Sequence, residues 1–392
     1  MNQPAILSFP AGMYPVASRR IRVLQTIRQG QVGGGESHLL SLVENLDRER
    51  YDPVVLSFTD GPMVEQLRRM DIPAHVIPTT SPFDIGVWTK VKKLMRDEQV
   101  DLVHAHGTRA LSNIYWPSKS LSLPVVYTIH GWSFHDDQKP LIKKIRVLSE
   151  KFLSSRTAVN ISVSQSNQQT GRKYFSSFDS VVIYNGIDLK KFNPHRPLHN
   201  IRAELNIPEE ACLVVFIARF NVQKQPLTLI KSFARAAEQL PHLRLLMVGD
   251  GDHRQQALEM ISDLGLKDKI YWQPFRQDVP DLLSAADIYV LPSLWEGMPI
   301  GLLEAMAMGK AVIATSVDGT REVIRHRENG LMVDAGQLEE KLADAIIEMV
   351  KDEPLRRQLQ SAAIQSVKDR FDVKYMTRQI EKVYQNLADK RN

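Results

Sequence analysis

The sequence predicts an α/β protein that consists of two doubly wound domains. Short apolar segments rich in β-branched residues alternate with longer amphipathic segments, a pattern typical of parallel sheets covered by helices on both faces. The alternation breaks once, at residues 193–197, where two prolines indicate a linker. We therefore expect a domain over residues 1–193, a second over residues 194–370, and a cleft between them.

The elements follow in order along the chain. In the first half we expect strands at residues 21–27, 53–58, 74–77, 102–106, 125–130 and 158–164, and helices near residues 39–46, 61–70, 88–99 and 139–155. In the second half we expect strands at residues 213–218, 243–248, 270–272, 288–291 and 311–314, and a strongly amphipathic helix at residues 338–350.

Composition limits the class of protein. The chain has 392 residues, 43% hydrophobic and 24% charged, enough for two full cores. Its one cysteine, Cys212, excludes an internal disulfide framework and is expected to be a strand residue. No apolar run approaches the length of a membrane span, and the first twenty residues lack the apolar core of a signal peptide. We expect a cytoplasmic protein.

The positive charge is concentrated in the first half. Residues 1–191 contain 24 Lys and Arg against 17 Asp and Glu, whereas the remainder contains 26 against 28. This excess favours an anionic partner, which could be lipid, nucleic acid or an acidic glycan. Aromatic residues are not interleaved with the cations as a nucleic-acid stacking surface requires, so nucleic-acid binding is the weaker alternative.

The most informative segment is residues 293–309, a glycine-containing loop that leads into a helix. Glu296 lies on the loop and Glu304 about one turn inside the helix, so the two carboxylates can hold opposite ends of one hydroxyl-rich ligand. Pro299 suits a first helical turn, and the free N–H groups there can bind a diphosphate. The alternative is a surface glutamate followed by one that the helix dipole favours. The expected buried side of the helix is Leu302, Leu303, Met306 and Ala307.

Two cations stand at the end of the first strand of the second half. Arg219 follows that strand, and Lys224 precedes a helix that begins at Pro226. Such groups can neutralise a diphosphate, the guanidinium in bidentate fashion and the ammonium as a point charge. The alternative is a pair of solvated loop cations.

Glycines and histidines mark further strand ends. Residues 33–36 form a glycine loop that lacks the Lys of a P-loop and the spacing of a dinucleotide fingerprint. His130 follows a strand and is either a functional group in the cleft or a plain hydrogen-bonded residue. His104 and His106 share one face of their strand, but no acidic ligand stands at suitable spacing, so we expect no metal site. Residues 249–252 either line the cleft or form an ordinary turn.

Residues 139–155 are predicted to form a basic amphipathic helix. It could dock on an anionic membrane, or it could be a scaffold helix with a solvated basic face. The cations expected to face such a membrane are Lys139, Lys143, Lys144 and Arg146.

Over nearly its whole length the chain resembles the retaining GT-B glycosyltransferases of family 4. The resemblance rests on an ordered set of motifs, namely Gly33–Glu36, Asp101–His106, Thr128–His130, Ser162–Ser164, Asn185–Asp188, Arg219 with Lys224, Gly249–Gly251 and Glu296–Glu304. It implies Rossmann-like domains of which the first binds the acceptor and the second a nucleotide-diphosphate sugar. It also implies that residues 371–392 form a helix that crosses back to the first domain.

The resemblance implies a role for each matching residue. Glu304 would hold the ribose hydroxyls, Arg219 and Lys224 the diphosphate, and Glu296 the donor sugar, while His130 would lie near the transferred sugar. The residues so implied as catalytic are His130, Arg219, Lys224 and Glu296. The implied donor-binding residues are Gly34, Gly35, Arg219, Lys224, Gly249, Asp250, Glu296, Gly297, Met298, Pro299, Ile300 and Glu304.

These observations lead to one main functional hypothesis. We expect a retaining transferase without metal or other cofactor, acting at the inner membrane face on a lipid-linked saccharide of surface polysaccharide or lipopolysaccharide biosynthesis. A GT-B nucleotide-sugar epimerase, which needs no acceptor, is the alternative enzyme.

Overall fold

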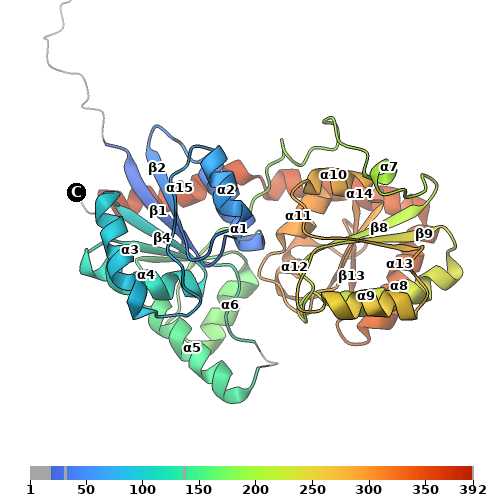
Figure 1. Cartoon of the computed structure of the whole chain (residues 1–392), viewed down its shortest axis with the longest axis horizontal. Coiled ribbons are helices and arrows are strands. Elements are labelled where there is room, and N and C mark those ends of the chain that lie inside the picture. Colours follow the sequence, from blue (N-terminus) through green and yellow to red (C-terminus); the bar gives the residue numbers. More distant parts are fainter. Residues whose placement is uncertain (1–18, 31–32, 136–137, 391–392) are drawn as a thin grey trace, which may run out of the picture.

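The computed structural model describes residues 19–30, 33–135 and 138–390 (Figure 1). The prediction that no signal peptide is present rests on the first twenty residues, of which residues 1–18 lie outside this range. Two parallel sheets form the two halves of the molecule, and each is covered by helices on both faces.

The first sheet has the strand order β3-β2-β1-β4-β5-β6-β7. Its strands are β1 (Ile21–Ile27), β2 (Tyr51–Ser57), β3 (Ala74–Val76), β4 (Leu102–His106), β5 (Val125–Ile129), β6 (Val159–Ser162) and β7 (Val181–Val182). The helices along this half are α1 (Gly34–Asn45), α2 (Pro62–Arg69), α3 (Ile85–Asp97), α4 (Thr108–Ser120), α5 (Pro140–Ser154) and α6 (Gln165–Tyr174).

The second sheet has the order β10-β9-β8-β11-β12-β13. Its strands are β8 (Cys212–Ile217), β9 (Leu243–Val248), β10 (Ile270–Gln273), β11 (Ile288–Leu291), β12 (Ala311–Thr315) and β13 (Leu331–Val333). The remaining helices are α7 (Ile201–Glu204), α8 (Pro226–Gln239), α9 (Arg254–Asp263), α10 (Val279–Ala285), α11 (Ile300–Ala307), α12 (Asp318–Val323), α13 (Leu338–Lys351), α14 (Glu353–Arg370) and α15 (Val373–Asp389).

Strand order reverses once in each sheet. In the first sheet β1 pairs with both β2 and β4, and in the second β8 pairs with both β9 and β11, all in parallel. On either side of such a reversal the chain continues toward opposite edges of the sheet. The loops therefore separate there and leave a crevice at the carboxyl ends of the central strands. Loops after β1, β4, β8 and β11 are therefore the ones that the fold places for ligand binding.

Helix α15 returns from the second half to cover the first sheet (Figure 1). Its apolar side packs in one cluster with residues of β1 and α1 such as Val23 and Leu42. The Tyr51 hydroxyl donates a hydrogen bond to the Glu381 carbonyl oxygen at 2.9 Å. The core of the first half is therefore assembled from both ends of the chain.

The two chain crossings between the halves lie side by side. The Ile187 amide donates to the Phe371 carbonyl at 2.7 Å, and the Val373 amide donates to the Ile187 carbonyl at 3.1 Å. A Cβ at Gly186 would stand 2.5 Å from the Val373 Cα, so glycine permits this close approach. One hydrogen-bonded seam thus joins both connections.

The predicted fold class is confirmed, and so is the expected alternation of strands and helices. The predicted strands 21–27, 102–106, 243–248 and 288–291 have the observed bounds. Helix α4, which contains Pro117, and the polar helix α14 are not among the elements that the pattern predicts. No described helix has the length and apolar composition that crossing a bilayer requires.

Candidate active site

The predicted donor residues gather at the strand-order reversal of the second sheet. Lys224 lies on the loop after β8 and Glu296 on the loop after β11, and their side chains form an ion pair. These side chains are only 20% and 8% exposed. Because the pair is shielded from solvent, removing one partner would leave an unpaired charge away from water, which is costly.

Further hydrogen bonds fasten the same two loops together. The Leu294 amide donates to the Gln223 carbonyl at 2.9 Å, and the Gln223 side-chain amide donates to the Trp295 carbonyl at 2.7 Å. Lys224 itself is positioned by its amide, which donates to the Asn221 side chain at 3.0 Å. Arg219 on the first of these loops is exposed, so its guanidinium is available to an anion.

The turn after β9 supports the loop that carries Arg219. Gly249 has φ +142°, and a Cβ there would stand 2.0 Å from the Ala218 carbonyl oxygen, so only glycine fits. The Asp250 carbonyl accepts a hydrogen bond from the Phe220 amide at 2.9 Å. The Asp250 carboxylate lies 3.5 Å from the Arg254 guanidinium. The turn thus holds the cationic loop in place mainly through its backbone.

Helix α11 begins one residue later than the sequence suggests. Pro299 is its N-cap, with φ −77° and ψ +104°, rather than its first helical residue. Glu304 lies about one turn inside, as predicted, and burial raises the pKa of its carboxyl to about 7, opposed by the charge of Lys191. The expected apolar side, from Leu302 to Ala307, is buried. Glu296 and Glu304 therefore flank the start of the helix.

The loop before α11 contacts the first half directly. A Cβ at Gly297 would stand 2.0 Å from the His130 carbonyl oxygen. The Asn185 side-chain amide donates to the Met298 carbonyl at 3.1 Å, while its oxygen lies 2.9 Å from Nδ1 of His38. Donor residues of the second half and His130 of the first half therefore meet at one place.

A ring contact and a carboxylate that caps a helix also join the two halves. The Trp295 ring stacks on the His135 ring with centroids 4.5 Å apart. The Glu322 carboxylate of α12 accepts hydrogen bonds from the Gln165 and Ser166 amides at the start of α6, at 2.9 and 2.7 Å. These contacts help to fix how the two halves are oriented relative to each other.

The glycine loop faces the same place. A Cβ at Gly35 would lie 3.5 Å from the His130 ring, whereas one at Gly34 would meet no atom within 4 Å. Burial raises the pKa of the neighbouring Glu36 carboxyl to about 7, and the positive charge of Arg219 opposes that rise. The loop thus lies within electrostatic reach of a donor cation from the other half.

Three histidines converge behind His130. One ring nitrogen each of His38, His106 and His130 lies within 4.8 Å of the others, and imidazole nitrogens suit zinc. His104 is not part of this group because its ring nitrogens contact Tyr384 and Thr128. From the sequence we weighed only His104 and His106 of β4 as metal ligands, because nothing in the pattern places His38 of α1 beside them. The expected absence of a metal requirement stays a prediction.

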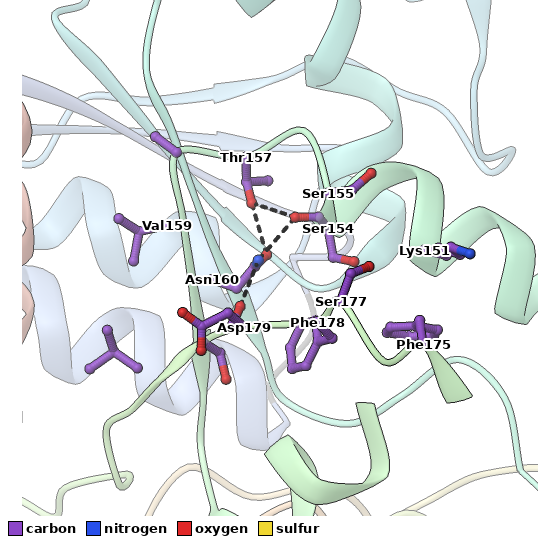
Figure 2. A pocket seen from close by; sticks show the side chains of 13 residues that line it. Lys151, Ser154, Ser155, Thr157, Val159, Asn160, Phe175, Ser177, Phe178 and Asp179 are labelled. Carbon is purple, nitrogen blue, oxygen red and sulfur yellow. Dashed lines mark hydrogen bonds between the residues drawn. The ribbon is translucent and has the colours of Figure 1, made fainter. Parts of the chain in front are cut away.

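A cavity of about 370 Å³ lies at the opposite edge of the first sheet (Figure 2). Residues at the start of β6 and β7 line it, and their polar groups are paired with one another. The Asn160 side-chain amide donates to the carbonyls of Ser154 and Asp179, at 2.9 and 3.1 Å. Because the strands are parallel, this amino-end edge is remote from the loops that carry the site, and the cavity is not part of it.

Two family models match consecutive parts of the chain. Residues 32–191 match the model for "Glycosyltransferase Family 4", and residues 199–366 match "Glycosyl transferases group 1". The chain belongs to the group 1, family 4 glycosyltransferases. The protein is therefore a glycosyltransferase, and this membership selects transfer over the epimerase and nucleic-acid-binding alternatives.

Similar proteins span nearly the same length as this glycosyltransferase. The UDP-Gal:alpha-D-GlcNAc-diphosphoundecaprenol alpha-1,3-galactosyltransferase of Escherichia coli is 25% identical, over 86% of this chain and 89% of its own. The phosphatidyl-myo-inositol mannosyltransferase of Mycobacterium leprae is 27% identical, over 91% and 94%. Anabaena HepE in complex with UDP and glucose has a TM-score of 0.82 at 24% identity, over 94% and 100%, which shows that the fold is shared.

The geometry adds contacts that the sequence motifs do not predict. Asn185 links α1 to the loop before α11, His38 stands beside His130, and Trp295 packs against the first half. Asn185 belongs to one of the recognised motifs, but the motif does not predict which residues Asn185 contacts. Trp295 lies in the segment 293–309 beside Glu296, but its contact with His135 was not predicted, and His38 carries no sequence signal, because only the folded chain brings it to the site.

Proposed function

We propose that the enzyme is a retaining, metal-independent transferase that moves a sugar from a nucleotide diphosphate to a lipid-linked saccharide in surface polysaccharide or lipopolysaccharide biosynthesis. The observation that carries the proposal is the shielded Lys224–Glu296 pair at the strand-order reversal, with Arg219 exposed on the same loop. Positive groups at this point suit a diphosphate, and the adjacent carboxylate suits sugar hydroxyls. The names of the two relatives, which include lipid-linked acceptors, support the acceptor class.

The charges explain how the site would promote transfer. Cleavage of the anomeric bond leaves negative charge on the departing diphosphate and positive charge on the sugar. Arg219, Lys224 and the N-terminus of α11 would stabilise the former, while Glu296 and Glu304 would hold the sugar and the ribose. The departing phosphate oxygen would receive the proton of an acceptor that attacks from the same face. This attack retains the anomeric configuration.

The first half would supply the other wall of the reaction centre. Gly34 and Gly35 would let the donor phosphates approach the backbone, and His130 would contact the transferred sugar. Gly249 and Asp250 would hold the cationic loop, while the backbone amides at Gly297, Met298 and Ile300 would face the donor. The close approach of Gly297 to His130 supports this arrangement.

A transfer assay tests the proposal. A thermal-shift panel of UDP-, GDP- and ADP-sugars should first identify the donor, because ligand binding raises the melting temperature. With that donor and a lipid-diphosphate saccharide, we expect transfer with the anomeric configuration retained by NMR and with an undiminished rate in EDTA. Inversion of the configuration would contradict the mechanism, and loss of activity in EDTA that zinc or magnesium restores would contradict metal independence.

Donor affinity should depend on pH through Glu304. A carboxylate accepts hydrogen bonds from ribose hydroxyls better than a protonated carboxyl does, so affinity should rise as pH increases through the pKa of about 7. From pH 6 to pH 8 we expect an increase of about tenfold in calorimetric binding of the donor. The Glu304→Gln variant should bind weakly at both pH values. A dependence that survives in Glu304→Gln but not in Glu36→Gln would assign the effect to Glu36, whose pKa is also about 7.

We also propose that helix α5 docks the enzyme on an anionic membrane. Of the four predicted cations, Lys139, Lys144 and Arg146 are exposed, while Lys143 is half-buried and lies over the Tyr174 ring at 4.9 Å. Arg146 also donates to the Ser133 carbonyl at 2.7 Å. Four apolar side chains of the same helix are 44–70% exposed, namely Leu141, Ile142, Ile145 and Leu148. An exposed apolar stripe flanked by lysines suits the interface of a bilayer.

Placing charge on that stripe should release the enzyme from vesicles. Burying each apolar side chain contributes about 1.5 kcal/mol or more, so Ile145→Glu with Leu148→Glu should weaken binding to phosphatidylglycerol vesicles more than tenfold in a sedimentation assay. Ile85→Glu is the matched control, since Ile85 is 73% exposed on another helix. Unchanged vesicle binding of the double variant would refute this docking surface.

A further inference from the structure

A chain of buried polar side chains connects helix α15 to His130. The Gln25 side-chain amide of β1 donates to the Tyr384 hydroxyl of α15 at 2.9 Å, and its oxygen lies 2.9 Å from Nε2 of His106. Nδ1 of His106 lies 3.1 Å from Nε2 of His130. Tyr384, Gln25 and His106 are at most 2% exposed, so water does not compete for these contacts. We call these four residues the relay.

The relay determines which ring nitrogen of each histidine carries hydrogen. An amide oxygen only accepts hydrogen bonds, so Nε2 of His106 must donate to Gln25. Burial lowers the pKa of His106 and His130 well below the ordinary value, which keeps both rings neutral. Nδ1 of His106 therefore carries no hydrogen and accepts the hydrogen bond. Nε2 of His130 must then carry the hydrogen and donate it.

Asn185 sets the tautomer of the neighbouring His38. Its amide donates to the Met298 carbonyl, so its oxygen accepts from Nδ1 of His38. Nε2 of His38 is then a lone pair, and it is buried without a partner among the described residues. One nitrogen of this ring lies within 4.8 Å of those of His106 and His130. An unpaired acceptor nitrogen of His38 thus lies in the same buried group of histidines as His130.

Tyr384 orients the relay from its far end. Its hydroxyl accepts from the Gln25 amide at 2.9 Å and lies 2.5 Å from Nδ1 of His104, which holds the hydroxyl in place. Without this hydroxyl the Gln25 side chain can turn over, and an amide NH₂ placed toward His106 would reverse every donor and acceptor down to His130. The orientation of one glutamine therefore sets the tautomer of the histidine in the site.

We propose that Tyr384 is a positioning residue for glycosyl transfer. Through Gln25 and His106 it holds His130 with hydrogen on Nε2, which leaves Nδ1 as an acceptor for a sugar hydroxyl. The inference rests on the proposed place of His130 beside the transferred sugar. It gives helix α15 a role in the chemistry of the site, in addition to covering the first sheet.

NMR of protein labelled with ¹⁵N-histidine tests the relay without any substrate. Two-bond ¹H–¹⁵N correlations distinguish the tautomers, and the His130 signals are identified by their loss in His130→Gln. We expect hydrogen on Nε2 of His130 in the wild type and a mixture of tautomers in Tyr384→Phe. Gln25→Met should give the same mixture and serves if Tyr384→Phe does not fold.

A matched control separates the relay from the packing of α15. The Tyr51 hydroxyl also bonds to this helix, and its ring packs edge-on against Tyr384, but it contacts no histidine. Tyr51→Phe should therefore leave the His130 tautomer unchanged. With an identified donor, Tyr384→Phe should lower kcat about tenfold while KM for the donor changes less than twofold, and Tyr51→Phe should leave both within twofold.

Three results would overturn the inference. They are hydrogen on Nδ1 of His130 in the wild type, an unchanged tautomer in both relay variants, and stoichiometric zinc bound by His38, His106 and His130, which would occupy the lone pairs instead of a proton. Failure to find any sugar transfer would refute the proposed function, whereas the NMR spectra would still report on the relay.

Discussion

Replacing Lys224 by alanine should lower kcat/KM for sugar transfer about 100- to 1000-fold. The ammonium stands between two loops that the fold brings together and is shielded by its pairing with Glu296. Removing one preorganised charge that stabilises a leaving group costs about 3–4 kcal/mol in activation free energy. The variant also leaves the Glu296 carboxylate unpaired, and its negative charge would repel the diphosphate. Initial rates over a range of donor concentrations measure the effect.

Two further variants show where the loss arises. Lys269→Ala removes a half-buried lysine that bonds to the Ala237 carbonyl outside the site, and it should keep its activity. Lys224→Ala combined with Glu296→Gln removes the unpaired carboxylate, and it should recover nucleotide binding but not the rate of transfer. Wild-type activity of folded Lys224→Ala, with an unchanged melting temperature, would remove this lysine from the mechanism.

Replacing Gly297 by alanine should lower kcat about 100-fold while the protein stays folded. The new Cβ would stand 2.0 Å from the His130 carbonyl oxygen, a separation that real contacts do not show. The loop that carries Glu296 must then move away from the first half by roughly an ångström, and a displacement of that size costs about 100-fold in rate. Rapid-quench measurement of single-turnover transfer isolates this step from product release.

Gly131→Ala is the matched control for this variant. Gly131 is the neighbour of His130 on the other side of the contact, and a Cβ there would meet no atom within 4 Å. It should transfer sugar at nearly the wild-type rate. Equal rates for Gly297→Ala and the wild type would show that the contact between the halves does not position the reacting groups.

Much of the fold is predictable because parallel strands buried on both faces are continuous apolar runs. Strand β11 has this character, whereas β9 departs from it at Arg244 and β4 at its two histidines, and the predicted bounds of all three match the observed ones. Strand β13, which has only three residues, is missed, although β3 of the same length is predicted. Helix α14 is missed because only Leu359, Ala363 and Val367 among its residues are buried, so its pattern is mainly polar.

The sequence allows residues of the candidate site to be proposed one by one, but it does not predict their contacts. Arg219, Lys224, Glu296 and Glu304 are recognisable from their places at strand ends and helix starts. The pairing of Lys224 with Glu296 joins residues 72 positions apart, and it exists because β8 and β11 are neighbours in the sheet. The approach of Gly297 to His130 depends on how the halves meet, which no local pattern encodes. Contacts of this kind depend on which strands are neighbours in the sheet and on how the two halves pack together.

Because helix α15 packs on the first half, the last segment of the chain to be synthesised completes the half that is synthesised first. During synthesis on a ribosome, residues 201–370 emerge and can complete the second sheet before residues 373–389 exist. Until those last residues appear, the apolar surface formed by Val23 and Tyr51 of the first sheet and Leu42 of α1 is not covered. The half of the enzyme that is translated first is therefore the half that finishes folding last.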